Sequence, residues 1–170
     1  AIVEDTANDA VKFLFEQKRN DVNKLTHDGR TYIFWAAYRG NTHFMEYLLA
    51  RGAKTNVLDA HGYTYLNFAA ANGQSNTKVY DLALKNGANL KKDLDHDGAN
   101  ALLLIAPHDK DFTLINYFIG KGLDIKSTDA NGNTAFNYAA RTGNITTLKR
   151  LLEKGVTFND NAMIFASQGT

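Results

Sequence analysis

The sequence predicts an all-α repeat solenoid, in which helix pairs stack into one elongated array. The first observation is a short motif that occurs four times, most clearly over residues 62–73 (GYTYLNFAAANG) and 132–143 (GNTAFNYAARTG). The second is the period of the motif. Its opening glycines stand 33, 36 and 34 residues apart, at Gly29, Gly62, Gly98 and Gly132. A near-constant period of this size is typical of units that bury their apolar faces only against their neighbours.

The motif reads Gly-x-Thr-x-Leu-x-x-Ala-Ala-x-x-Gly, with a degenerate third copy, and it resembles the ankyrin repeat. The resemblance covers nearly the whole chain. It implies two antiparallel helices and a β-hairpin finger per unit, and a concave groove between the inner helices and the fingers. Two family positions differ, namely the proline after the threonine and the histidine two residues later. Their replacements are Tyr32, Tyr65, Ala101 and Ala135, and Phe34, Asn67, Leu103 and Asn137. We therefore expect a divergent array, less stable than an idealised one.

Composition excludes several classes of function. Nineteen basic and eighteen acidic residues leave a net charge of +1, so no whole-molecule field attracts nucleic acid or an anionic membrane. The absence of cysteine excludes disulfides, thiol catalysis and zinc sites built on thiolates. No apolar run reaches the roughly 18 residues that a membrane-spanning helix needs. We expect a soluble monomer with no nucleic-acid partner and no membrane insertion.

The start of the chain bears on its location. The sequence begins at Ala1 and lacks an initiator methionine, which fits either removal of a targeting peptide or an expression boundary. This start and the absence of cysteine favour a periplasmic or secreted protein over a cytoplasmic one. Frequent asparagine and lysine favour a bacterial source.

We expect one ankyrin-like domain over residues 1–170. Its expected divisions are a cap helix and connector at 1–28, repeats at 29–61, 62–97, 98–131 and 132–160, and the start of a fifth unit or a C-terminal cap at 161–170. The cap helix is expected because Val11, Leu14 and Phe15 repeat at the spacing of one apolar helical stripe. Met163 and Phe165 are expected to bury one face of the last helix on the fourth repeat. Either a half-repeat caps the array or a longer protein continues past Thr170.

Each repeat is expected to begin with a short inner helix, capped by a threonine hydroxyl such as that of Thr31. Its alanine pair lets neighbouring units approach closely. The outer helix is expected to bury an apolar face. Its apolar residues are Phe44, Tyr47, Leu48 and Leu49 in the first repeat and Ile145, Leu148, Leu151 and Leu152 in the fourth. Glycines are expected to end both kinds of helix, at Gly40, Gly73 and Gly143 and at Gly52, Gly87, Gly122 and Gly155.

The third repeat is the least regular. Residues 105–111 replace the glycine that ends the inner helix, and Pro107 is expected to stop that helix at about Ala106. We interpret residues 105–111 as a tolerated surface insertion. Residues 74–78 are expected to accommodate a two-residue insertion in the second repeat.

No catalytic constellation with a recognisable spacing occurs, and we expect neither an enzyme nor a cofactor. Histidines and aspartates gather on three successive finger tips. They are His27 and Asp28, Asp59 and His61, and Asp95, His96 and Asp97. Stacked fingers are expected about 10 Å apart, as packed helices are. Because metal–ligand bonds are about 2 Å long, we expect these tips to hold no structural metal.

An aromatic ladder is the sharper signal. Trp35, Phe68, Leu104 and Tyr138 occupy one position of the inner helices, and Tyr38 lies one turn after Trp35. Packing between repeats is the alternative for these rings. Trp35, Tyr38 and Tyr138 have polar groups suited to a half-exposed interface. The predicted partner-binding residues are Arg30, Trp35, Tyr38, His61, Tyr63, Phe68, His96, Asn133, Tyr138 and Arg141.

Two functions follow from these patterns. The first is a protein-protein interaction module that binds a protein partner through the groove and fingers without catalysis of its own. The second is a spacer or targeting segment of a larger enzyme or toxin whose active domain lies outside this chain. An active site within residues 1–170 is a third possibility.

Overall fold

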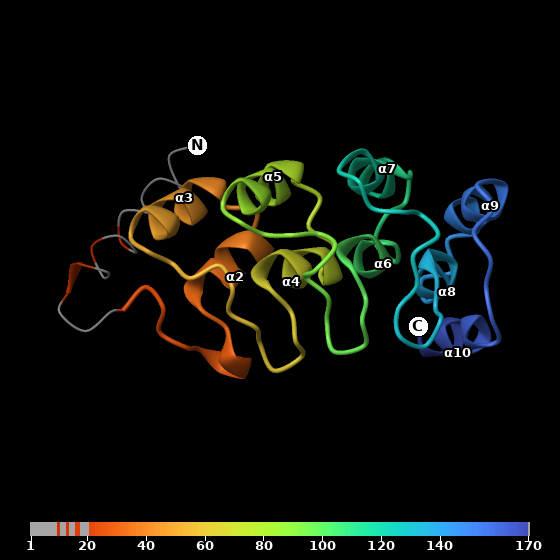
Figure 1. The fold of residues 1–170 in the computed structure, drawn as a ribbon, viewed down its shortest axis with the longest axis horizontal. Helices are drawn as coiled ribbons and strands as arrows, with labels where there is room; N and C mark the ends of the chain where they lie inside the picture. The colour runs from red at the N-terminus through yellow and green to blue at the C-terminus, as the bar shows by residue number, and fades with distance from the viewer. Residues whose placement is uncertain (1–9, 11–12, 14–15, 18–20, 170) are drawn as a thin grey trace.

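A computed structural model describes residues 10, 13, 16, 17 and 21–169, which form two layers of helices with loops projecting from one side (Figure 1). The inner layer contains α2 (Tyr32–Tyr38), α4 (Tyr65–Ala71), α6 (Ala101–Ile105) and α8 (Ala135–Ala140). The outer layer contains α3 (Thr42–Ala50), α5 (Thr77–Lys85), α7 (Thr113–Gly120) and α9 (Ile145–Glu153). The last helix, α10 (Asn161–Gln168), packs against α8 as a further inner helix. The predicted all-α array is confirmed, while the predicted cap helix at Val11, Leu14 and Phe15 lies outside the described residues.

The core lies between the two layers along the whole array. Alanine pairs of the inner helices are buried, including Ala36 and Ala37 in α2 and Ala69 and Ala70 in α4. Small side chains at these positions allow helices of neighbouring units to pack closely. The largest fully buried side chains include Phe34, Met45, Tyr65, Leu66, Tyr80, Leu102, Ile115 and Phe118.

Side-chain caps begin most of the helices. The hydroxyls of Thr64 and Thr134 accept hydrogen bonds from backbone N–H groups of α4 and α8. The prediction for Thr31 is wrong, because its buried hydroxyl makes no capping hydrogen bond and has no partner among the described residues. Asparagines cap three of the outer helices, namely Asn41 before α3, Asn76 before α5 and Asn144 before α9.

The apolar face of α9 is narrower than predicted. Leu151 is fully buried, but Ile145 and Leu152 are 59% and 46% exposed. This helix lies at the end of the outer layer (Figure 1), so no further outer helix among the described residues covers its far side.

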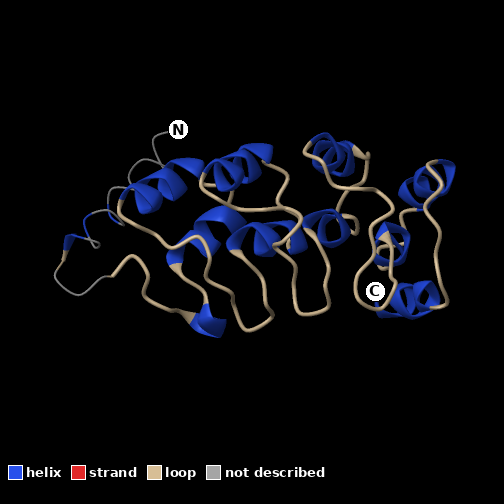
Figure 2. Ribbon diagram, in the orientation of Figure 1, coloured by secondary structure: helices blue, strands red, loops and turns tan. Residues whose placement is uncertain are grey.

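The fingers are turns, and the first one contains the short 3₁₀ helix η1 (His27–Gly29). Among the described residues no strand forms (Figure 2), and the one isolated bridge pairs Thr128 with Thr134. In three fingers an aspartate carboxylate accepts two backbone N–H groups of its own turn, at Asp59, Asp95 and Asp129. These bonds occupy donors that a β-ladder would use, which explains why the predicted β-hairpins are absent.

Residues 105–111, interpreted from the sequence as a tolerated surface insertion, lie partly at the surface but are bonded to the neighbouring repeats. As predicted, α6 ends just before Pro107, with Ala106 as its C-cap. The segment that follows is bonded to both neighbouring repeats: the His108 imidazole lies 2.9 Å from the Ala71 carbonyl, and the Thr142 hydroxyl donates to the Pro107 carbonyl. Asp109 is 3% exposed and accepts the Ile115 N–H at 2.8 Å. The insertion is therefore part of the stack.

The last helix bears out one of its two predicted apolar contacts, because Phe165 packs against the core and Met163 does not. Ala162 is buried against the fourth repeat, and the Phe165 ring lies 5.1 Å from the Tyr138 ring. Met163 is 78% exposed, so its predicted burial is wrong. Residues three apart share a helix face, which places Met163 away from the face that carries Ala162 and Phe165.

Candidate functional site

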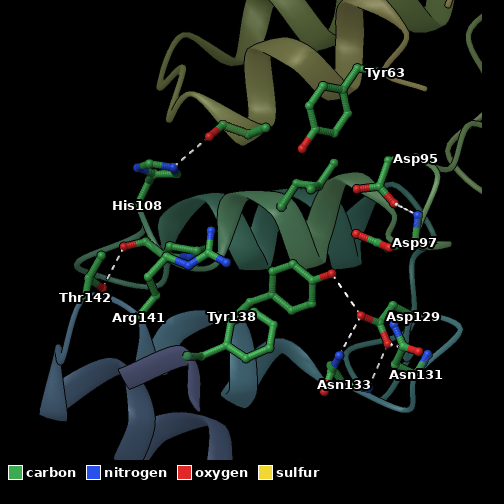
Figure 3. Close-up of a pocket in the computed structure, with 14 residues that line it drawn as sticks. Tyr63, Asp95, Asp97, His108, Asp129, Asn131, Asn133, Tyr138, Arg141 and Thr142 are labelled. Carbon is green, nitrogen blue, oxygen red and sulfur yellow. Dashed lines mark hydrogen bonds between the residues drawn. The ribbon is translucent and has the colours of Figure 1, made fainter. Parts of the chain in front are cut away.

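A groove runs between the inner helices and the fingers. It consists of two adjoining hollows that share Tyr63 and Ala71 in their walls. The aromatic hollow, of about 650 Å³, is lined by Arg30, Trp35, Tyr38, Arg39, His61, Phe68 and Asn72 besides the shared pair. The acidic hollow, of about 440 Å³, is lined by residues of the second, third and fourth repeats and by Phe165 of α10 (Figure 3). Its charged residues are Asp95, Asp97, Asp129 and Arg141, together with the titratable His108.

Two rings of the aromatic hollow are accessible. Trp35 and Tyr38 are each 36% exposed, and both pack against the buried Phe68 with ring centroids 5.8 and 5.9 Å apart. The Trp35 indole N–H donates to the Thr26 hydroxyl at 2.9 Å, which fixes the orientation of the ring. These rings therefore present preorganised apolar surface with one open edge.

Arg30 is a buried residue in the wall of the aromatic hollow. Its Nε donates to Asp59 Oδ2 at 2.8 Å and its Nη1 to Asp28 at 3.1 Å. The guanidinium carbon lies 4.3 Å from the centroid of the Phe68 ring. The Asp59 side chain is fully buried, so this cation compensates a carboxylate that has left water.

The acidic hollow places three carboxylates near two tyrosines. The Tyr138 hydroxyl donates to Asp129 Oδ2 at 3.0 Å, and burial together with the Asp129 charge raises the pKa of Tyr138. Burial also raises the pKa of the Tyr63 hydroxyl, with a further contribution from Asp95. For Asp95, burial raises the pKa and the neighbouring Asp97 and Asp129 charges add to it, outweighing two backbone N–H bonds that lower it.

Comparison with known proteins agrees with this geometry. A family model described as ankyrin repeats in three copies matches residues 1–93 and again residues 75–162. The chain belongs to the ankyrin repeat family. Ankyrin repeats are generally protein-interaction modules.

The ankyrin repeats of this chain are similar to segments of longer proteins. It is 34% identical to ankyrin repeat protein FPV115 of fowlpox virus over 74% of this chain, and 27% identical to palmitoyltransferase AKR1 of the yeast Lachancea kluyveri over 75%. It is 24% identical over 78% of its length to the human transient receptor potential cation channel subfamily A member 1. The matches cover 22%, 17% and 12% of those proteins respectively. These viral and eukaryotic relatives give no support to a bacterial source.

The predicted contact residues fall into accessible and buried groups in this ankyrin groove. His61 and Arg141 are exposed in the groove, where Arg141 lies over the Phe165 ring at 5.1 Å. His96 is exposed but lines neither hollow. Tyr63 is half-buried. The buried group comprises Arg30, Phe68, Asn133 and Tyr138, of which Tyr138 is only 8% exposed. Residues of this group shape the groove walls and position the accessible residues.

The predicted contact residues omit the carboxylates of the acidic hollow. Asp95, Asp97 and Asp129 line it, and none is among the residues predicted to bind a partner. The available signal is the register, because Asp59, Asp95 and Asp129 each stand three residues before an opening glycine. Among the described residues no group of three or more His, Cys, Asp or Glu residues is arranged to hold a metal ion. Over the same residues no helix is long and apolar enough to cross a membrane.

Proposed function

We propose that this ankyrin array binds a protein partner in the concave groove and has no catalysis of its own. The observation that carries the proposal is the continuity of the two hollows, which join at Tyr63 and Ala71. Trp35 and Tyr38 offer accessible aromatic surface at one end, and acidic side chains lie at the other. Rigid aromatic anchors of this kind dominate binding energy at protein interfaces, and charged groups around them select the partner.

The groove is suited to an extended peptide segment or a loop. Its walls are fixed before binding, because Trp35 bonds to Thr26, Arg30 bonds to Asp59, and Tyr138 bonds to Asp129. A preorganised surface loses little conformational freedom when a partner binds.

A random peptide display library, selected on the immobilised full chain, tests this proposal. Selected peptides are then measured by calorimetry on wild type, Trp35→Ala and Tyr38→Ala. We expect each substitution to cost about 2 kcal/mol, which is about a 30-fold loss of affinity. These residues are preferred to the buried Tyr138, whose truncation would disturb the stack.

Ile145→Ala is the matched control, because Ile145 is exposed on the outer helix α9 and lies outside both hollows. Thermal melting establishes that all variants remain folded. Peptides that bind Trp35→Ala and Tyr38→Ala as tightly as wild type would refute the groove as the binding site.

The alternative function is a spacer or targeting segment of a larger protein. It is favoured by the small share of the relatives that the chain matches, between 12% and 22% for the three named above. One of these relatives is a palmitoyltransferase. Extending the source open reading frame past Thr170 tests this alternative, which predicts a non-repeat domain there.

A further inference from the structure

One aspartate recurs in three successive fingers. Asp59, Asp95 and Asp129 occupy the same position in successive fingers, and in each the Oδ1 atom accepts two backbone N–H groups of its own turn. This shared arrangement leaves the Oδ2 atom to bond elsewhere. The three carboxylates are therefore bonded alike within their turns, and they differ in what surrounds Oδ2.

The partners of Oδ2 differ along the series. In Asp59, Oδ2 accepts the Arg30 guanidinium at 2.8 Å. In Asp129, it accepts the Tyr138 hydroxyl at 3.0 Å and the Asn133 amide at 2.9 Å. In Asp95, Oδ2 accepts no hydrogen bond from any described residue. Figure 3 shows that one carboxylate oxygen of Asp95 points into the acidic hollow.

The register explains why Asp95 lacks a cation. Arg30 directly follows the opening glycine of the first repeat and reaches the carboxylate of the next finger. In the second repeat the equivalent residue is Tyr63. The chain thus repeats the carboxylate without repeating the arginine that neutralises it.

The surroundings of Asp95 have an excess of negative charge. Asp97 and Asp129 line the same hollow, and none of the three carboxylates makes a salt bridge with a described residue. The opposing wall carries Arg141, whose guanidinium lies over the Phe165 ring. Three carboxylates facing one guanidinium favour a ligand that brings positive charge.

We infer that the acidic hollow binds an arginine side chain of the protein partner, with its guanidinium on Asp95 Oδ2, as Arg30 binds Asp59. This inference rests on the proposed function and names the chemistry of the bound segment. Arginine is favoured over lysine because its planar guanidinium pairs with a carboxylate while its faces lie against rings or aliphatic groups. Arg30 does this over Phe68, and the acidic hollow offers the corresponding surface of Leu104 and the Tyr138 ring.

Short blocked peptides test the assignment without an identified partner. Acetyl-Gly-Arg-Gly-amide and its lysine and glutamine counterparts are titrated into the ¹⁵N-labelled full chain and followed by NMR. We expect the arginine peptide to shift the amides of residues 95–99 and 129–133 saturably. The glutamine peptide should leave them unchanged, and the lysine peptide should bind several-fold more weakly.

Two variants make the test specific. Asp95→Asn retains an oxygen for the turn N–H groups and is expected to weaken arginine-peptide binding at least about tenfold. Tyr63→Arg supplies an internal guanidinium and is expected to abolish binding by occupying Asp95. Glu153→Gln removes one exposed negative charge outside the groove and is expected to leave binding unchanged.

The outcomes separate this inference from the proposed function. Equal binding of the arginine and lysine peptides, or arginine-peptide binding unaffected by Asp95→Asn, would overturn the arginine assignment. Library peptides that require Trp35 but contain no essential arginine would also overturn it, while leaving the groove as the binding site. Selected peptides indifferent to Trp35 and Tyr38 would contradict the proposed function itself.

Discussion

The aromatic and acidic hollows are built from equivalent positions but differ in how charge is compensated. In the aromatic hollow, Arg30 neutralises the buried Asp59 and stacks on Phe68. In the acidic hollow, Asp95 occupies the place of Asp59, and Tyr63 occupies the place of Arg30. The finger carboxylate beside the aromatic hollow is paired before any partner binds, whereas the one in the acidic hollow has an oxygen that accepts no hydrogen bond from a described residue. The difference teaches that one repeat motif can serve stability in one unit and recognition in the next.

The largest expected effect is at the compensated site. Arg30→Ala leaves the fully buried Asp59 carboxylate without its cation and is expected to lower the free energy of unfolding by about 3 kcal/mol. Urea unfolding measures this loss. Arg51→Ala is the control, because the Arg51–Glu16 pair is 3.8 Å long with side chains 45% and 60% exposed, and we expect it to cost less than about 1 kcal/mol.

Arg30→Met separates charge from packing at the same site, since methionine is long enough to reach the Phe68 ring but carries no charge. It is expected to be nearly as destabilising as Arg30→Ala. If both variants unfold like Arg51→Ala, Asp59 does not depend on Arg30.

The second effect comes from copying the compensated site into the acidic hollow. Tyr63→Arg is expected to form an ion pair with Asp95 that stabilises the fold by about 1 kcal/mol relative to the same change made in an Asp95→Asn background. The double-mutant cycle cancels the packing lost with the tyrosine ring. A coupling energy near zero in urea unfolding would show that the two fingers are not equivalent in geometry.

The smallest effect is a pH dependence at Asp95. Burial raises the pKa of this carboxyl above its unfolded value of about 3.9, so the folded state binds the proton more tightly than the unfolded state does. The stability that protonation supplies is complete below the unfolded pKa and is lost as pH rises through the folded pKa. Asp95→Asn should therefore match wild type near pH 3 and exceed it by less than about 1 kcal/mol at pH 7.

Unfolding curves of the two proteins at several pH values check this expectation, with Glu153→Gln as the control for the loss of an exposed carboxylate. An advantage of Asp95→Asn that persists unchanged at pH 3 would mean that ionisation of Asp95 is not its cause.

The sequence predicts the periodic features because they depend on local backbone requirements. The seven glycines predicted to end inner or outer helices all have positive φ, which other residues adopt at a cost. Pro107 likewise marks the end of α6, because proline cannot continue the hydrogen bonds of a helix. The alanine pairs predict where neighbouring helices approach closely.

Some family substitutions have a structural role that the pattern alone does not reveal. Asn67 and Asn137 stand where a histidine is expected, and both are fully buried. The Asn67 amide donates to the Asp93 carbonyl at 2.8 Å, and the Asn137 amide donates to Asn159 Oδ1 at 2.6 Å. Both bonds join an inner helix to the next connecting loop, so each asparagine links successive units.

The sequence by itself determines the repeat, its period and the helix ends that glycine and proline mark, because these follow from backbone geometry within one unit. Only the tertiary structure decides which ladder rings are open, since the exposure of Trp35 and the burial of Tyr138 depend on the neighbouring units. It alone shows Met163 turned outward and residues 105–111 bonded into the stack. It also shows that Asp59 is paired with a cation whereas Asp95 is not, because the arginine that balances the Asp59 charge lies about 30 positions away in the sequence.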